Sequence, residues 1–328
     1  MTLVLKNLAA RYHQTGLPAE VVEVEKLSLP PPGKGEVRVK MLYAPINPAD
    51  LNMLEGKYGE ARSLPDVPGN EGVGRVEAAG EGSGEGWLGQ YVLVDRQAWQ
   101  EEGNWKVDHL IKVPQGLDPR QAAMLRINPP TAWLLLHHFT SLSSGDWVVQ
   151  NAATSGVGKA VIEIAKSSGW RTLNLIRRVE AAEGLRTLGA DAVLVDGPEM
   201  AAQAKEVLLG HVCRLGLNAV GGSAATRLAG LLEPGGALLT YGAMSREAVK
   251  IPNGFLIFRD LHFQGFWLTR WLSRASDKEV DKVFREIFRL AATGCFQPSV
   301  AQEFPLVKVK EAVALAAGGV SGKVLLKF

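Results

Sequence analysis

A strand, a glycine-bearing turn and a helix follow one another between residues 147 and 165, and this order constrains the fold more than any other feature. Residues 147–151 form a short apolar run that is typical of a buried strand. From Val157 onward, apolar residues recur at i, i+4, i+7 and i+8 and give a helix one apolar face. A second predicted strand at residues 172–176 completes a βαβ unit.

The alternation continues beyond residue 176. Strand patterns lie at residues 192–195, 214–220 and 237–242, with helical segments between them, which is typical of a doubly wound α/β fold around a parallel sheet. The first 120 residues differ, because short β-type runs alternate there with turns rich in proline and glycine. This pattern indicates a compact, mostly β domain. A chain of 328 residues accommodates two domains of these kinds.

The last 55 residues or so contain one well-specified helix and one strand pattern. Ser276 and Glu279 predict a capping box at the start of the helix, and Gly294 is suited to close it. Residues 321–328 are predicted to form a final strand.

The turn at residues 152–158 is related to the dinucleotide fingerprint G-x-G-x-x-G, of which only Gly158 is kept. Ala153 and Ser155 replace the first two glycines with the smallest available side chains, so the approach of a pyrophosphate is narrowed and not blocked. The helix behind the turn offers N–H groups and a partial positive charge to an anion. The hydroxyl groups of Thr154 and Ser155 are additional candidate donors.

Two arginines follow the second strand, where a dinucleotide fold that binds NAD has an acidic residue for the ribose 2′-hydroxyl. A guanidinium group forms charge-assisted bonds with a 2′-phosphate, which a carboxylate would repel. Arg177 and Arg178 therefore favour NADPH as the cofactor. The alternative interpretation is a simple connecting turn beside arginines on a solvated edge.

Composition excludes several classes of function. A formal net charge of +2 without a clustered basic stripe gives no reason to expect nucleic acid as a partner. No apolar stretch approaches the roughly 20 residues that span a bilayer. The first residues lack a secretory signal pattern, so we expect a cytoplasmic protein without membrane association. Cys213 and Cys295 match neither a disulfide framework nor zinc-ligand spacing, and we expect no bound metal.

Beyond these patterns, the sequence resembles the medium-chain dehydrogenase/reductase superfamily, and within it the zinc-free mitochondrial-type trans-2-enoyl-thioester reductases. The segments that carry the resemblance are "INPADLNMLEGKYG" (46–59), "PGNEGVG" (68–74), "INPPTAW" (127–133), "QNAATSGVGKAVIEIA" (150–165), "LNAVGG" (217–222), "YGAMS" (241–245) and "LIFRDLHFQGFWLTRW" (256–271). The resemblance implies a Rossmann cofactor domain, residues 121–265, inserted into a β-rich GroES-like catalytic domain, residues 1–120 and 266–328. It also implies a homodimer, since relatives commonly pair through the edge strands of their cofactor domains.

Zinc enzymes of the superfamily carry a cysteine near the position of Asn47 and a Gly-His-Glu sequence where this chain has Gly69, Asn70 and Glu71. They also have a four-cysteine lobe for which this chain lacks the cysteines. The resemblance therefore implies hydride transfer that is assisted by protein groups and not by zinc.

By resemblance, Tyr58 is the proton donor of the reaction. Hydride addition to C3 of an α,β-unsaturated thioester develops an enolate, and a phenol beside that charge stabilises it or delivers a proton to C2. Asn47 is expected to orient the phenol or the substrate carbonyl. An alternative for Tyr58 is a turn aromatic that covers the core. Quinone reductases of the same superfamily often have a similar tyrosine, which leaves the substrate open.

The resemblance also implies a set of cofactor-binding residues. These are Asn128, Thr154, Ser155, Gly156, Val157, Gly158, Arg177, Arg178, Tyr241, Gly242, Ala243, Met244, Phe266, Trp267, Leu268, Thr269 and Lys323. Trp267 is further expected beside both the nicotinamide and the acyl chain of the substrate. For the aromatic residues of this set, ordinary packing is the alternative interpretation.

The predicted function is NADPH-dependent reduction of the C2–C3 double bond of a trans-2-enoyl thioester carried by coenzyme A or acyl carrier protein. Segment 85–114 departs from the family pattern, and it has Gly89, Gln90, Tyr91 and Val92 in place of the usual L-x-P-G-D-x-V lead. An NADPH-dependent reductase of quinones or general enones is the alternative enzyme. A non-catalytic NADPH-binding protein is the alternative from another class.

Overall fold

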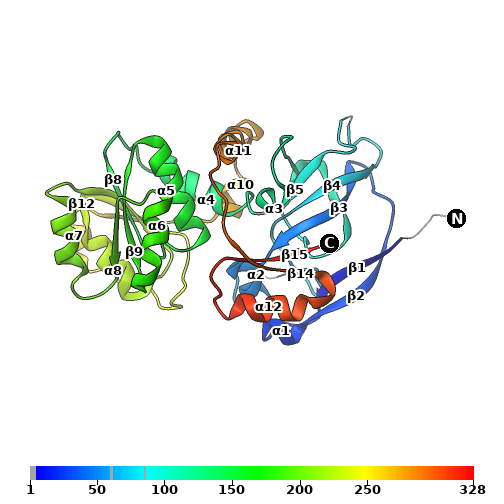
Figure 1. Ribbon diagram of the computed structural model, residues 1–328, viewed down its shortest axis with the longest axis horizontal. Coiled ribbons are helices and arrows are strands. Elements are labelled where there is room, and N and C mark those ends of the chain that lie inside the picture. Colours follow the sequence, from blue (N-terminus) through cyan, green and yellow to red (C-terminus); the bar gives the residue numbers. More distant parts are fainter. Residues whose placement is uncertain (1–4, 60–61, 85) are drawn as a thin grey trace. The chain divides into compact units, whose positions relative to one another are not determined.

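The computed structural model describes residues 5–59, 62–84 and 86–328 (Figure 1). The chain forms two compact units, the first running to Ile127 and including Gln297–Phe328, the second comprising Asn128–Phe296. The second unit is thus inserted into the sequence of the first. The predicted domain limits, residues 120 and 265, lie short of these boundaries. Residues 266–296 group with the second unit because α11 (Asp277–Ala292) packs on α4 (Asn128–His137) within it.

The second unit is built on a six-stranded parallel sheet, as the alternation of strands and helices predicts. In spatial order its strands are β10 (Ala192–Val195), β9 (Arg171–Ile176), β8 (Trp147–Gln150), β11 (Cys213–Asn218), β12 (Leu232–Thr240) and β13 (His262–Gly265). The chain starts at β8 in the middle of the sheet and reverses direction after β10, which makes the fold doubly wound.

Helices cover both faces of this sheet (Figure 1). On one face α5 (Gly156–Ser168) and α6 (Ala182–Leu188) form an apolar cluster with the turn after β8. On the other face α7 (Met200–Leu208) and α8 (Gly222–Gly230) pack on the apolar side chains of the strands. The short helices α9 (Asn253–Ile257) and α10 (Leu268–Leu272) complete the unit.

The first unit is β-rich, as predicted. Its larger sheet has the order β14 (Val300–Pro305), β15 (Lys323–Lys327), β3 (Glu36–Pro45), β4 (Gly72–Ala79), β5 (Tyr91–Val94) and β7 (Ile111–Lys112), and β6 (Glu102–Lys106) pairs with β3. A two-stranded antiparallel sheet joins β1 (Leu5–Tyr12) to β2 (Val22–Leu29). The helices are α1 (Pro18–Val21), α2 (Pro48–Leu54), α3 (Pro119–Ala122) and α12 (Val309–Ala317), with short 3-10 turns at Val107–His109 and Leu306–Lys308; a third, Val179–Ala181, lies in the second unit.

The core of the first unit is formed by apolar side chains of the larger sheet and its flanking segments, among them the fully buried Met41 of β3 and Trp99 between β5 and β6. Its strands alternate buried and exposed residues where one face meets solvent, as in β4. No helix among the described residues is both long and apolar enough to cross a membrane.

The capping box at the start of α11 is present as predicted. The Glu279 carboxylate accepts the Ser276 N–H at 2.8 Å. Strand β13 was not predicted, because three of its four residues are exposed or polar and its sequence, "HFQG", has no buried-strand pattern. It pairs with β12 through its backbone, which the side chains do not signal.

Candidate active site

The carboxyl ends of four parallel strands bring most of the predicted cofactor residues of the second unit to one edge of the sheet. The turn at residues 152–155 follows β8, Arg177 follows β9, Tyr241 follows β12 and Phe266 follows β13. In doubly wound folds this edge is where ligands bind. Only the strand order is needed to place these residues near one another.

The turn before α5 is closed by a side-chain cap. Ser155 is the N-cap residue, and its hydroxyl oxygen accepts the N–H of Gly158 at 3.0 Å. Among the described residues, the N–H groups of Gly156 and Val157 have no hydrogen-bond partner. Two donors at the positive end of a 13-residue helix therefore remain available to an anion.

Two close approaches explain the glycines at the start of α5. A Cβ on Gly158 would lie 2.7 Å from backbone atoms of Ala152 and Ala153, so only glycine lets α5 approach the strand. A Cβ on Gly156 would lie 2.8 Å from the side-chain amide of Asn128, the first residue of α4. The left-handed conformation falls on Ala152, with φ of 49°, and not on Ala153.

Tyr241 and Gly242 follow β12 beside the turn. Burial raises the pKa of the Tyr241 phenol well above its ordinary value, an effect that the nearby Ser155 hydroxyl opposes. Its buried oxygen makes no hydrogen bond of ordinary geometry within the described chain. Gly242 packs on Ala219, whose carbonyl oxygen would lie 2.9 Å from a Cβ. Ala243 and Met244 are exposed.

Arg177 and Arg178 are exposed at the end of β9, and within the described residues neither forms an ion pair. Arg227 offers a contrast, because its guanidinium group binds the Asp196 carboxylate through two contacts of 2.7 Å each. The two arginines therefore present positive charge that no carboxylate of the described chain neutralises.

A ladder of buried amides, which the sequence interpretation missed, supports this edge. Asn151 donates to the Oδ1 atom of Asn218 at 2.8 Å, and Asn218 donates to the hydroxyl of Thr240 at 3.1 Å. Gln150 donates to the carbonyl oxygen of Gly158 at 2.9 Å and so ties α5 to β8. The sequence does contain a signal for this ladder, because polar residues at the ends of otherwise apolar strands need hydrogen-bond partners when they are buried.

The segment 266–269 is partly packing and partly exposed. Phe266 is buried and meets Phe139 edge to face at a centroid distance of 5.7 Å, and Leu268 is also buried. Trp267 is half-buried with the Arg270 guanidinium 5.8 Å from its ring centroid, whereas Thr269 is exposed. For Phe266 the packing interpretation therefore describes what the side chain does, while Trp267 retains exposed surface.

In the first unit, Tyr58 lies in the loop after α2 and is half-buried. Asn47 is the N-cap residue of α2, only 3% exposed, and its N–H donates to Asp50 at 2.7 Å. Lys323 begins β15, and its ammonium group donates to the Oδ1 atom of Asn47. The structure therefore brings together Asn47 and Lys323, which are separated by 276 positions in the chain.

Two buried carboxyl groups join this cluster. Glu71 is fully buried, and burial raises its pKa to about 7, opposed chiefly by the charge of Lys323. Asp50 is also fully buried, and burial raises its pKa to about 6, opposed chiefly by hydrogen bonds from Asn47 and Asn70. Both groups thus titrate close to neutral pH. Within the described residues no group of three or more His, Cys, Asp and Glu side chains is arranged to hold a metal ion.

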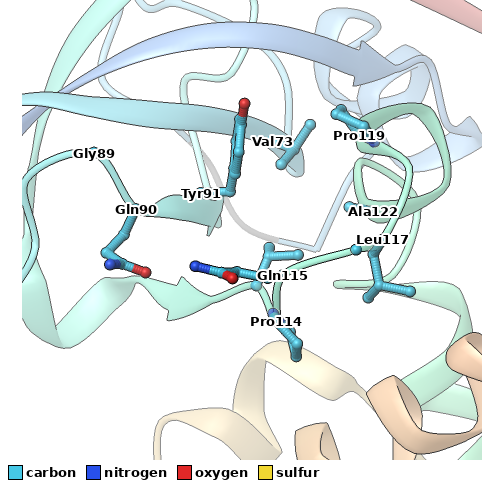
Figure 2. Close-up of a pocket in the computed structure, with 11 residues that line it drawn as sticks. Val73, Gly89, Gln90, Tyr91, Pro114, Gln115, Leu117, Pro119 and Ala122 are labelled. Carbon is cyan, nitrogen blue, oxygen red and sulfur yellow. The ribbon is translucent and has the colours of Figure 1, made fainter.

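A cavity of about 220 Å³ in the first unit is lined by part of the segment that departs from the family pattern. Figure 2 shows Gln90, Gln115, Leu117 and Ala122 among the residues that line this cavity. No predicted site residue lines it. Glu85, the first residue of the departing segment, lies outside the described residues.

The described residues of the second unit fit a dinucleotide phosphate. They offer two free N–H groups at a helix start, a buried hydroxyl without an ordinary partner, and two guanidinium groups free of ion pairs. The N–H groups and the guanidinium groups are of the kinds that bind anions. This fit rests on the donors themselves and on the absence of room for a side chain at Gly156 and Gly158.

Two family models match the chain, the alcohol dehydrogenase GroES-like domain over residues 33–113 and the zinc-binding dehydrogenase over residues 156–288. With the inserted Rossmann unit, they define the class of the protein as a medium-chain dehydrogenase/reductase. The mitochondrial enoyl-acyl-carrier-protein reductase of Xenopus tropicalis is 38% identical over 316 residues, which cover 92% of this chain and 90% of that protein. The chain therefore belongs to the enoyl-acyl-carrier-protein reductase family.

Two solved structures are similar over nearly the whole length. A complex of Etr1p with NADP and crotonyl-CoA, in which Etr1p is a mitochondrial 2-enoyl thioester reductase of Candida tropicalis, has a TM-score of 0.88 and 28% identity and covers 99% of this chain and 100% of that one. A putative NADPH:quinone reductase from Bacillus thuringiensis has a TM-score of 0.93 and 29% identity, with 99% of each chain covered. The predictions of family and fold are thus confirmed.

Proposed function

We propose that this protein is an NADPH-dependent 2-enoyl-thioester reductase that saturates the C2–C3 double bond of an acyl-CoA or acyl-carrier-protein substrate. The observation that carries the proposal is the near full-length similarity to reductases of this class, one of which was solved with NADP and crotonyl-CoA. The proposal assigns a role in this reaction to residues of both units.

The second unit holds the cofactor in this proposal. The N–H groups of Gly156 and Val157, with the hydroxyl of Thr154, bind the pyrophosphate, and Asn128 and Tyr241 flank it. Arg177 and Arg178 bind the 2′-phosphate and thereby select NADPH over NADH. The remaining cofactor-binding residues of the proposal are 242–244, 266–269 and Lys323. Trp267 also contacts the acyl chain of the substrate.

The first unit supplies the proton. Bound NADPH supplies the hydride, which adds to C3 of the substrate. The phenol of Tyr58 stabilises the enolate charge that develops at the thioester and gives its proton to C2. Asn47, whose amide is hydrogen-bonded at both ends, acts by holding its neighbours in place.

Kinetics of wild type and Tyr58→Phe test this function. NADPH oxidation is followed with crotonyl-CoA, longer 2-enoyl-CoAs and a panel of quinones. We expect wild type to turn over the thioesters, and Tyr58→Phe to lower kcat/KM by about 10²- to 10⁴-fold with unchanged NADPH affinity, because only proton transfer is lost. Tyr43→Phe, at a tyrosine of β3, is the matched control and should retain activity.

Two outcomes contradict the proposal. Turnover of quinones without any thioester would establish the quinone reductase instead, a second candidate favoured by the similarity to the Bacillus thuringiensis protein. Tight NADPH binding without turnover of either substrate would establish a non-catalytic NADPH-binding protein. The substitution of Tyr58 leaves cofactor binding intact in each case, so the outcomes are distinguishable.

Assembly as a homodimer is part of the proposal. Strand β13 is an edge strand of the six-stranded sheet, and its outer backbone groups are available for pairing. Three exposed apolar residues, Leu256, Ile257 and Phe258, precede it, the last being 84% exposed. An apolar patch next to an open strand edge is typical of an interface between subunits.

A cytoplasmic location stays a prediction, since the Xenopus tropicalis relative is named as mitochondrial.

A further inference from the structure

Glu71 is a fully buried carboxyl group whose two oxygens make different contacts. Its Oε1 atom accepts a hydrogen bond from the side-chain amide of Asn47 at 2.7 Å. Its Oε2 atom accepts the backbone N–H groups of Arg126 at 3.2 Å and Ile127 at 3.0 Å. Ile127 is the last residue of the first unit and directly precedes Asn128. One carboxyl group is thus bonded both to the Asn47 amide and to the backbone that leads to Asn128.

The contact with Glu71 decides which way the Asn47 amide points. In its ionised form, which the charge of Lys323 favours, Glu71 only accepts hydrogen bonds, so the NH₂ end of the amide faces it. The opposite end, Oδ1, then faces Lys323 and accepts from its ammonium group. If the amide were reversed, it would present N–H groups to an ammonium that has no lone pair to accept them. Glu71 and Lys323 therefore require the same orientation of the Asn47 amide, one from each end.

The other charged groups around Glu71 have their own partners. Asp50 accepts the N–H of Asn47 and two N–H groups of Asn70, at 2.7 to 2.9 Å. The Arg126 guanidinium lies 3.9 Å from the Asp95 carboxylate. Lys323, Asp50 and Arg126 all act on the charge of Glu71, and Lys323 is the largest opposing influence on its raised pKa. Two consecutive hydrogen bonds therefore link Glu71 to Asn47 and Asn47 to Lys323 at the centre of the cluster.

We propose that Glu71 is a positioning residue of the reductase, which acts through Asn47 to hold the Lys323 ammonium group where it binds NADPH. This inference rests on the proposed function, because Lys323 is assigned to the cofactor there. Glu71 is fully buried, so in this proposal it acts through Asn47. Its contacts with the backbone of Arg126 and Ile127 anchor the same carboxyl group and prevent it from following the Asn47 amide.

A double-mutant cycle on NADPH binding tests the proposal. Glu71→Gln keeps the shape of the side chain but lets its amide donate, so the Asn47 amide is free to reverse and turn N–H groups toward Lys323. NADPH affinity is measured by fluorescence titration without substrate. We expect Glu71→Gln to raise the Kd about tenfold, a size typical of coupled neighbouring side chains. In a Lys323→Met background, Glu71→Gln should leave the Kd unchanged.

Glu163→Gln is the matched control. Glu163 is likewise a mostly buried carboxyl group that accepts a backbone N–H, that of Phe296 at 3.0 Å, and its pKa is also raised by burial. Its substitution should leave NADPH affinity unchanged. Steady-state kinetics should show the matching split, with the KM for NADPH raised in Glu71→Gln and kcat changed less than about threefold.

An equal effect of Glu71→Gln in both backgrounds would overturn the proposal, since it would show a general structural role. So would an unchanged Kd. If Glu71→Gln does not fold, Glu71→Asp, which shortens the side chain but keeps its charge, is used in the same cycle. Because binding is measured without turnover, a failure of wild type to reduce enoyl thioesters would refute the proposed function while leaving this test readable.

Discussion

Arg177 and Arg178 decide between two cofactors that differ by a single phosphate group. Both are exposed at the end of β9 and form no ion pair within the described chain. We expect Arg177→Ala with Arg178→Ala to raise the Kd of NADPH about tenfold to a hundredfold, as expected for lost hydrogen bonds to a charged group. The Kd of NADH should change little.

Fluorescence titration with both nucleotides measures this difference. Arg186→Ala is a suitable control, because this arginine is also exposed and lies on α6 in a weak contact with Glu183. An equal loss of affinity for NADPH and NADH in the double variant would show that the 2′-phosphate binds elsewhere.

Single residues also mark the limit of sequence interpretation. Gly158 and Arg177 were predicted from the turn motif and the strand that follows it, and Tyr241 was predicted from the resemblance to the family. The contact between Lys323 and Asn47 was not predicted, since it joins residues 276 positions apart and no local pattern encodes it. Ser155 was predicted as a donor to phosphate, yet its oxygen serves first as the acceptor that caps α5.

At the scale of elements, the junction of β8 and α5 depends on Gly158. A methyl group there would meet backbone atoms at 2.7 Å, which a side-chain rotation cannot relieve. We expect Gly158→Ala to lower the free energy of unfolding by about 1–3 kcal/mol and to weaken NADPH binding, because the helix start must move away from the turn. Denaturant titration and NADPH titration measure the two effects.

Gly184→Ala provides the control for that substitution. Gly184 lies exposed within α6, no atom lies within 4 Å of the point that an alanine methyl group would occupy, and alanine is the better helix former. It should leave NADPH binding unchanged and raise the stability by up to about 1 kcal/mol. Unchanged stability of Gly158→Ala would show that the close approach at the turn is not required.

Most elements of the second unit follow from hydrophobic periodicity. Strands β8 to β12 and helix α11 have apolar patterns of the right period, and the structure contains them. Strand β13 escaped prediction because it is held by backbone pairing with β12 at the edge of the sheet. The amide ladder of Asn151 and Asn218 escaped for a related reason, since it depends on which strands are neighbours.

At the scale of the whole molecule, the exposed residues before β13 predict a dimer. Sedimentation of wild type should give twice the chain mass, and Phe258→Glu should shift it toward the monomer because a charge would be buried in the interface. Leu88→Glu, at an exposed leucine of the other unit, should leave the dimer intact. A wild type that stays monomeric at all concentrations would contradict this assembly.

The reduction of an enoyl thioester is tested most directly by following the transferred hydrogen. Wild type is incubated with crotonyl-CoA and NADPH that carries deuterium at the transferable C4 position, and the product is examined by mass spectrometry and NMR. We expect butyryl-CoA with deuterium at C3 and a solvent-derived hydrogen at C2, because hydride adds at C3 and Tyr58 protonates C2. Absence of butyryl-CoA while quinones are reduced, or deuterium at C2, would contradict the proposed function.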